Sequence, residues 1–128
     1  MKNLILNNKI EVRKSKIHGY GVFAKEKIKK GEILEECHII SFPKEYYDLV
    51  PLYRNAYVFP RNDNYKEIVL PLGYGCIYNS SHNPNADWIK DEKRRLIIFK
   101  SIEEIEKNEE ICWDYEVNIV YCIKNNLI

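Results

Sequence analysis

The sequence lacks an excess of charge of either sign, since 20 Lys and Arg residues face 19 Asp and Glu residues and leave a formal net charge of +1. A net charge this small creates no overall field that would attract nucleic acid or a membrane surface, so any partner is selected locally. Long apolar runs are missing too. The first eight residues contain only a three-residue run, Leu4 to Leu6, and no later stretch is long enough to cross a bilayer. These absences predict a soluble, intracellular protein that binds neither nucleic acid nor membrane directly.

Cysteine and histidine are present, but not at the spacings that metal sites use. The sequence has no Cys-x-x-Cys pair and no recognisable histidine ligand spacing; the residues concerned are Cys37, Cys76, Cys112, Cys122, His18, His38 and His82. The sequence therefore predicts no metal site.

A long helical period is also missing, and short apolar runs separated by turn residues take its place. A chain of 128 residues is long enough for one core, so we expect a single domain over 1–128. The predicted elements are two short strands within Lys9–Ala24, a strand ending at Ile40, a hairpin over Ala56–Leu72, a second hairpin joining Ala86–Ile89 to Arg94–Phe99, and a strand at Ile111–Trp113. Leu96–Phe99 is expected to be buried on both faces. The tail, Val117–Ile128, fits either a helix or a strand. The pattern predicts a mainly β fold.

Two similar turns occur far apart in the chain. Gly31, in Ile28-Lys29-Lys30-Gly31, is free to take a positive φ before a strand, and Asn108 stands at the matching place after Ile105. We interpret the two turns as equivalent corners of a strand-rich fold.

The stretch from Gly73 to Trp88 combines features that rarely occur together. Its glycines, Pro84 and Asn/Ser residues oppose regular structure, yet the apolar run Cys76 to Tyr78 leads directly into Asn79. Polar groups carried toward an interior in this way need partners, which is typical of a binding site. Taken alone, Asn79 also fits a satisfied turn residue.

Three separate segments agree in order and spacing with one family. His18 to Ala24 (HGYGVFA) resembles the first motif of SET-domain protein-lysine methyltransferases. Leu72 to Ala86 (LGYGCIYNSSHNPNA) resembles their Asn-His-Ser-x-x-Pro-Asn motif, and Glu109 to Tyr115 (EEICWDY) resembles their Glu-Glu-Leu-x-x-x-Tyr motif. The likeness covers a core of residues 10–116. The chain is similar to the small, single-domain viral and bacterial members.

The resemblance implies a β-clip-like fold in which the central and C-terminal motifs form a pseudoknot. It also implies that S-adenosylmethionine binds to main-chain groups of His18, Gly19 and Tyr20. Asn79 would accept a hydrogen bond from the cofactor's ammonium group, and the Ser80 backbone would meet the adenine edge.

The same resemblance assigns the chemistry to the C-terminal motif. Tyr115 would be the catalytic residue, its hydroxyl orienting the methyl group and the lysine nitrogen. Tyr57, Tyr74 and Trp113 would wall the channel that receives the lysine. For these three aromatics, packing in the core is an equal alternative. Glu109 and Glu110 are adjacent on a strand and so point to opposite faces, and we interpret both as turn and surface residues.

Two departures from the family pattern leave alternatives open. The usual histidine of the central motif is Ser80 here, which fits either an active enzyme or a catalytically degenerate SET module that binds a peptide or protein partner. No cysteine cluster follows Tyr115, so residues 117–128 or a second subunit of a homodimer would complete the channel. A third alternative is a sugar- or ice-binding β-clip domain.

The substrate implied by the family is a protein, with a histone tail as its best-known form. A peptide would add as a strand beside Ala56–Phe59. If the source is a virus or an intracellular bacterium acting on a eukaryotic host, the host nucleus would be the place of action.

Overall fold

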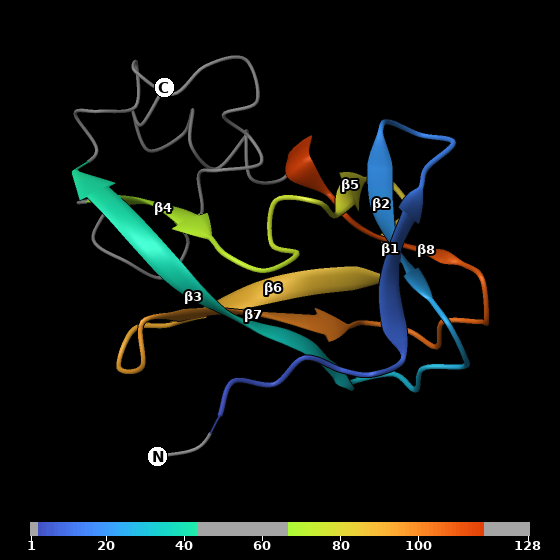
Figure 1. Ribbon diagram of the computed structural model, residues 1–128, viewed down its shortest axis with the longest axis horizontal. Helices are drawn as coiled ribbons and strands as arrows, with labels where there is room; N and C mark the ends of the chain where they lie inside the picture. The colour runs from blue at the N-terminus through green and yellow to red at the C-terminus, as the bar shows by residue number, and fades with distance from the viewer. Residues whose placement is uncertain (1–2, 44–66, 117–128) are drawn as a thin grey trace.

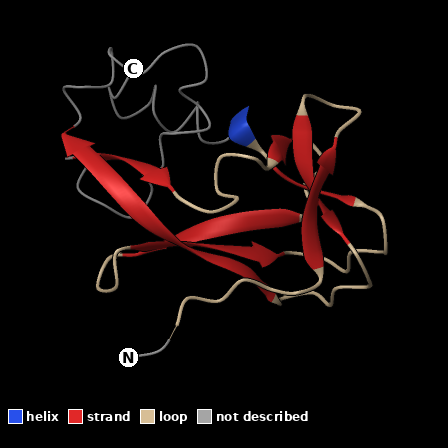
Figure 2. Cartoon of the chain, viewed as in Figure 1, coloured by secondary structure: helices blue, strands red, loops and turns tan. Residues whose placement is uncertain are grey.

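The computed structural model describes residues 3–43 and 67–116, and these residues form eight β-strands (Figures 1 and 2). The strands are β1 (Ile10–Lys14), β2 (Tyr20–Ala24), β3 (Ile33–Pro43), β4 (Glu67–Pro71), β5 (Asn79–Ser80), β6 (Ala86–Asp91), β7 (Leu96–Ser101) and β8 (Glu110–Trp113). They make two four-stranded sheets with the orders β1-β2-β8-β5 and β4-β3-β7-β6. The predicted mainly β fold is confirmed.

The first sheet joins the two ends of the described chain. β1 and β2 are antiparallel, with Val12 opposite Val22, and β8 pairs with the other edge of β2, with Ile111 opposite Val22. β5 then lies parallel to β8. Residues separated by about ninety positions therefore share one small sheet.

The second sheet contains the longest strand and the predicted second hairpin. β6 and β7 are antiparallel, with Trp88 opposite Phe99, and β7 also pairs with β3. All four residues of Leu96–Phe99 are buried, as the unbroken apolar run predicts. β4 pairs with the far end of β3. The first half of the expected Ala56–Leu72 hairpin, including Tyr57, lies outside the described residues, as does the tail 117–128.

The core lies between the two sheets and is rich in aromatic rings. The ring of Tyr78 stacks on Phe99 with centroids 4.3 Å apart, and Trp113 meets Trp88 edge to face at 6.0 Å. Tyr78, Phe99 and Trp113 are essentially inaccessible to solvent. Because these rings come from β6, β7, β8 and the β4–β5 loop, the core fixes the second sheet against the segments that carry the central and C-terminal motifs.

The two similar turns prove to be partners. Gly31 and Asn108 both have positive φ, 84° and 71°, and the residues three positions earlier, Ile28 and Ile105, form an antiparallel bridge with hydrogen bonds of 2.8 and 2.9 Å. The prediction of two equivalent corners is confirmed.

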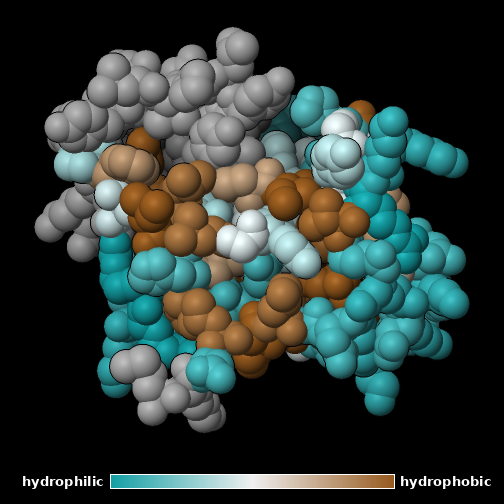
Figure 3. All heavy atoms as spheres, in the orientation of Figure 1, coloured by the Kyte–Doolittle hydropathy of each residue, from teal (hydrophilic) through white to brown (hydrophobic). Residues whose placement is uncertain are grey.

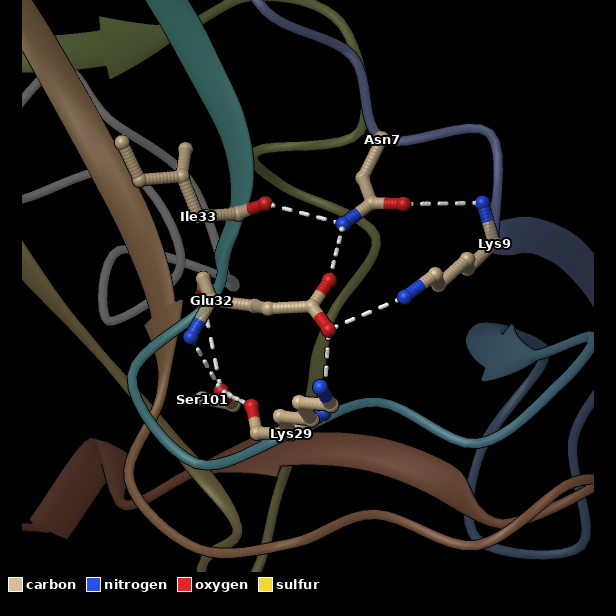
Figure 4. Close-up of polar contacts among 6 residues, drawn as sticks. All are labelled: Asn7, Lys9, Lys29, Glu32, Ile33 and Ser101. Carbon is tan, nitrogen blue, oxygen red and sulfur yellow. Dashed lines mark hydrogen bonds and ion pairs between the residues drawn. The ribbon is translucent and has the colours of Figure 1, made fainter.

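A carboxylate fastens the N-terminal segment to the start of β3 (Figure 4). Glu32 accepts hydrogen bonds from Asn7 Nδ2 at 3.0 Å, Lys9 Nζ at 2.9 Å and the Lys29 backbone N–H at 3.1 Å. These donors hold the pKa of the Glu32 carboxyl below its usual value, and the Lys29 backbone N–H is the largest cause. None of the residues in this cluster belongs to the three motifs.

One face of the molecule has separate apolar and hydrophilic regions (Figure 3). Apolar side chains gather across its middle, over β3, β4 and the β4–β5 loop, whereas hydrophilic side chains cover the side of β1 and β2. The β4–β5 loop, which is the first part of the central motif, thus lies at an apolar surface.

Candidate functional site

The central and C-terminal motifs pass alongside each other as a parallel pair. Asn79 lies opposite Cys112 and Ser80 opposite Trp113, and the Ser81 N–H donates to the Trp113 carbonyl at 3.2 Å. The buried Asn85 side chain continues this pairing, because its Nδ2 donates to the Glu110 carbonyl and its Oδ1 accepts from the Cys112 N–H, both at 2.9 Å. This interlocking is the expected pseudoknot. Asn85 was not among the predicted site residues, although it closes the predicted central motif.

The side-chain amide of Asn79 joins all three motifs. Its Nδ2 donates to the backbone carbonyls of His18 at 3.0 Å and Tyr20 at 3.1 Å, and to Glu110 Oε2 at 2.7 Å. Three acceptors around one end of the amide fix its orientation, since the oxygen could not face them. Among the residues described, no donor reaches the Asn79 side-chain oxygen. That oxygen is the group left for a ligand.

Glu110 corrects the interpretation of both glutamates as surface residues. Glu109 is exposed, but Glu110 is half-buried, and besides Asn79 it accepts a 2.7 Å hydrogen bond from the Ser15 hydroxyl. Gly21 makes room for it, because a Cβ at Gly21 would lie 2.2 Å from Glu110 Oε2. Glu109 precedes β8, so the two glutamates are not adjacent on a strand as the sequence predicted, and strand alternation could not show that Glu110 faces the β1–β2 turn.

Tyr115 is held at both its backbone and its hydroxyl. Its N–H donates to Ser80 Oγ at 3.0 Å, and its hydroxyl donates to the backbone carbonyl of Tyr78. Tyr115 is half-buried, with its ring 4.5 Å from the ring of Trp113. The predicted catalytic hydroxyl therefore contacts the residue directly before Asn79.

The remaining predicted residues lie around this centre in different environments. His18 and Gly19 lie in an exposed turn between β1 and β2, Tyr20 is the exposed first residue of β2, and Gly19 has a φ of 48°. Tyr74 is half-buried against the core, and Trp113 is buried within it. Tyr57 lies outside the described residues. The channel roles of these aromatics stay predictions.

A buried carboxyl lies beneath the central motif and was not foreseen. Glu35, on β3, is 4% exposed and accepts from the Tyr78 hydroxyl at 2.9 Å and the Tyr74 N–H at 2.8 Å. Burial raises the pKa of the Glu35 carboxyl, and these two donors oppose that rise. Burial likewise raises the pKa of Cys112 to about 12, so this thiol stays protonated and unreactive at neutral pH.

Next to Tyr115, an exposed histidine meets two carboxylates. His82 Nδ1 lies 3.6 Å from Asp114 and 3.2 Å from Glu116, and the three side chains offer ligand atoms within 4.8 Å of one another. Exposed contacts of this kind are ordinary ion pairs unless a bound ion indicates otherwise. The expectation that the protein has no metal site stays a prediction.

Comparison with known proteins gives the class to which this geometry belongs. The SET domain family matches residues 19–116. A histone-lysine N-methyltransferase of Schizosaccharomyces pombe, described as specific for H3 lysine-37, is 31% identical over 90% of this chain and 78% of its own length. A putative histone-lysine N-methyltransferase 1 of Plasmodium falciparum is 31% identical over 93% of this chain. The match covers only 2% of that much longer protein.

Solved structures agree with the sequence comparisons. The crystal structure of a putative histone methyltransferase of Plasmodium falciparum superposes with a TM-score of 0.68 at 34% identity, over 86% of this chain and 95% of that one. Arabidopsis thaliana SUVH6, solved in complex with S-adenosylmethionine, has a TM-score of 0.69 at 17% identity over 86% of this chain and 28% of that one, which supports the fold alone.

This chain belongs to the SET-domain family. Its relatives are named as histone-lysine methyltransferases, and this supports a protein-lysine methyltransferase. The described residues contain no helix that is both long and apolar enough to span a membrane.

Proposed function

We propose that the protein is an S-adenosylmethionine-dependent protein-lysine N-methyltransferase that acts on a histone tail. The observation that carries the proposal is the hydrogen bonding of Asn79, whose amide connects the first motif to the C-terminal motif beside the Tyr115 hydroxyl.

The residues present fit the proposed cofactor. His18, Gly19 and Tyr20 are exposed beside Asn79, and Asn79 keeps this segment in place through the carbonyls of His18 and Tyr20. The Asn79 oxygen, which accepts nothing within the described part of the chain, suits the ammonium group of an amino-acid moiety. When bound, S-adenosylmethionine supplies a methyl group on a positively charged sulfur.

In this proposal Tyr115 orients the two reacting groups. Its ring is fixed by Trp113, its N–H by Ser80 and its hydroxyl by the Tyr78 carbonyl, so the phenol is held before substrate binds. Fixed positioning is the main help that a displacement of this kind needs, and a misplacement of about 1 Å can cost on the order of 100-fold in rate.

The attacking lysine nitrogen must be neutral, although a free lysine has a pKa of about 10.4. Aromatic walls lower the pKa of an inserted lysine by excluding water, and a neighbouring positive sulfur lowers it further. Tyr74 is half-buried at the edge of the core and is suited to such a wall. No acid or metal is required of the chain in this scheme.

Histone H3 is the first substrate to test, because the Schizosaccharomyces pombe relative is named for a lysine of H3. The purified chain is incubated with isotopically labelled S-adenosylmethionine and a panel of core histones, and methylated lysines are located by mass spectrometry. We expect a methylated histone lysine with the wild type and at least about 100-fold less product with Tyr115→Phe. Wild-type turnover by Tyr115→Phe would remove this residue from its role.

Ser80 keeps a second candidate open, a SET module that binds a partner without catalysis. Here Ser80 Oγ accepts from the Tyr115 N–H, a structural contact that serves either function. Isothermal titration with S-adenosylmethionine separates the two, since absence of binding at millimolar cofactor favours the binding module.

A further inference from the structure

Glu35 is a buried residue that the proposed mechanism does not use. Glu35 lies in β3, next to a register shift between Ile33 and Glu35, and its carboxyl points into the loop that leads to Asn79. One oxygen, Oε1, accepts from the Tyr78 hydroxyl, and the other, Oε2, accepts from the Tyr74 N–H. One carboxyl therefore holds both ends of a five-residue segment, Tyr74–Tyr78.

The backbone of this loop is shaped around the carboxyl. Gly73 has a φ of 71°, and a Cβ there would lie 2.2 Å from Glu35 Oε2. Any other residue at position 73 would suffer both the left-handed backbone and a direct clash. A buried carboxyl costs free energy unless its hydrogen bonds are made, so the two donors of this loop offset the cost of burying Glu35.

Tyr78 connects the Glu35 carboxyl to the candidate site. Its ring is fully buried between the Glu35 carboxyl and the Phe99 ring, and its backbone carbonyl is the acceptor of the Tyr115 hydroxyl. The orientation of that carbonyl follows from where the side chain of the same residue is anchored. Displacing the Tyr78 ring would therefore displace the acceptor of the proposed catalytic phenol.

We propose that Glu35 is a positioning residue for methyl transfer. Through the Tyr78 hydroxyl it fixes the Tyr78 carbonyl, which orients Tyr115. Through the Tyr74 N–H it fixes a residue that is predicted to wall the lysine channel. This inference rests on the proposed function of the site. Glu35 touches neither cofactor nor substrate in this scheme.

The test uses the full chain and three variants, Tyr78→Phe, Glu35→Ala and the double variant. Tyr78→Phe removes one oxygen and keeps the ring and the carbonyl. Glu35→Ala removes both carboxyl oxygens, so the Tyr78 hydroxyl and the Tyr74 N–H each lose their acceptor. We measure kcat and KM per folded molecule on the methylated histone, the Kd of S-adenosylmethionine by titration, and the melting temperature. Tyr78→Phe carries the test if Glu35→Ala does not fold.

We expect each single variant to lower kcat about tenfold, as a modest displacement of the reacting groups would, while the Kd of S-adenosylmethionine stays within about twofold of the wild type. Glu35→Ala should also raise KM for the histone, because it alone removes the acceptor of the Tyr74 N–H. If both changes act through the same hydrogen bond, the kcat of the double variant should match that of the worse single variant.

Glu32→Gln is the matched control, because it also removes a hydrogen-bonded carboxylate next to β3 but lies in the cluster of Figure 4. It should lower the melting temperature and leave kcat unchanged. Any of three results would overturn the proposal: kcat losses that multiply in the double variant, wild-type kcat in both single variants, or an equal loss of kcat in Glu32→Gln. If the wild type binds cofactor but methylates no protein, the proposed function fails and this inference fails with it. Methylation by the wild type with unaltered single variants refutes the inference alone.

Discussion

Replacing Asn79 with Asp tests the central contact of the site, because it exchanges a donor for an acceptor of the same shape. In the wild type, Asn79 Nδ2 lies 2.7 Å from Glu110 Oε2 and close to two backbone carbonyls. In Asn79→Asp an oxygen would replace that nitrogen and face three acceptors. The favourable contact, worth about 1.5–3 kcal/mol for a hydrogen bond to a charged group, would become a repulsive one.

The size of the effect follows from the distance. Two unit charges 2.7 Å apart interact by about 6 kcal/mol at an effective dielectric constant of ~20. The folded variant relieves this repulsion by taking up one proton between the two carboxyls, which the unfolded chain does not need at neutral pH. Because the folded state then binds more protons, stability rises as the pH falls. We expect Asn79→Asp to lose about 3–5 kcal/mol at pH 8, a large part of the total stability of a small domain, and to recover most of it near pH 5.

The assay is urea unfolding at pH 5 and pH 8, with Asn83→Asp as the control. Asn83 belongs to the same motif but is exposed, so its replacement should change stability by less than about 0.5 kcal/mol at either pH. Adding Glu110→Gln to Asn79→Asp restores a donor between the two side chains and should recover part of the loss at pH 8. If Asn79→Asp shows the same small, pH-independent change as Asn83→Asp, Asn79 does not face Glu110 in the folded protein.

Two further predictions concern residues around the same frame. Gly21→Ala places a Cβ 2.2 Å from Glu110 Oε2 and must displace the Glu110 side chain from Asn79. We therefore expect titration to show at least about a tenfold loss of affinity for S-adenosylmethionine. Unchanged affinity would show that Glu110 is not needed for the β1–β2 turn to bind the cofactor. Glu32→Gln should cost about 1 kcal/mol at pH 7, since the Glu32 side chain is partly exposed. The pKa of Glu32 is lowered in the folded state. The stability difference between Glu32→Gln and the wild type is therefore fully present at pH values above the ordinary glutamate pKa of about 4.3. It disappears as the pH falls through the lowered pKa of the folded state. A difference that persists unchanged to pH 3 in thermal unfolding contradicts this assignment.

Local sequence patterns were sufficient for most of the strands. The β6–β7 hairpin, the burial of Leu96–Phe99 and the positive φ of Gly31 and Asn108 could be predicted from the residues nearby in the sequence. The approach of Asn79 to the C-terminal motif was expected from the resemblance to the family and not from any periodicity. The roles assigned to His18, Gly19, Tyr20, Asn79, Ser80 and Tyr115 stay predictions.

The sequence by itself determined which segments become strands, where the chain turns and which motifs it carries, because backbone preferences and apolar alternation act over a few residues. Only the tertiary structure decided which carboxyl groups are buried and which are exposed to solvent. Glu109 and Glu110 are neighbours, yet the first is exposed and the second binds Asn79, 31 positions away. Glu35 is buried because β3 passes under Tyr74 and Tyr78, some 40 positions later. A carboxyl group is polar in any sequence, and whether it meets water or a buried donor depends on which distant segment the fold places against it.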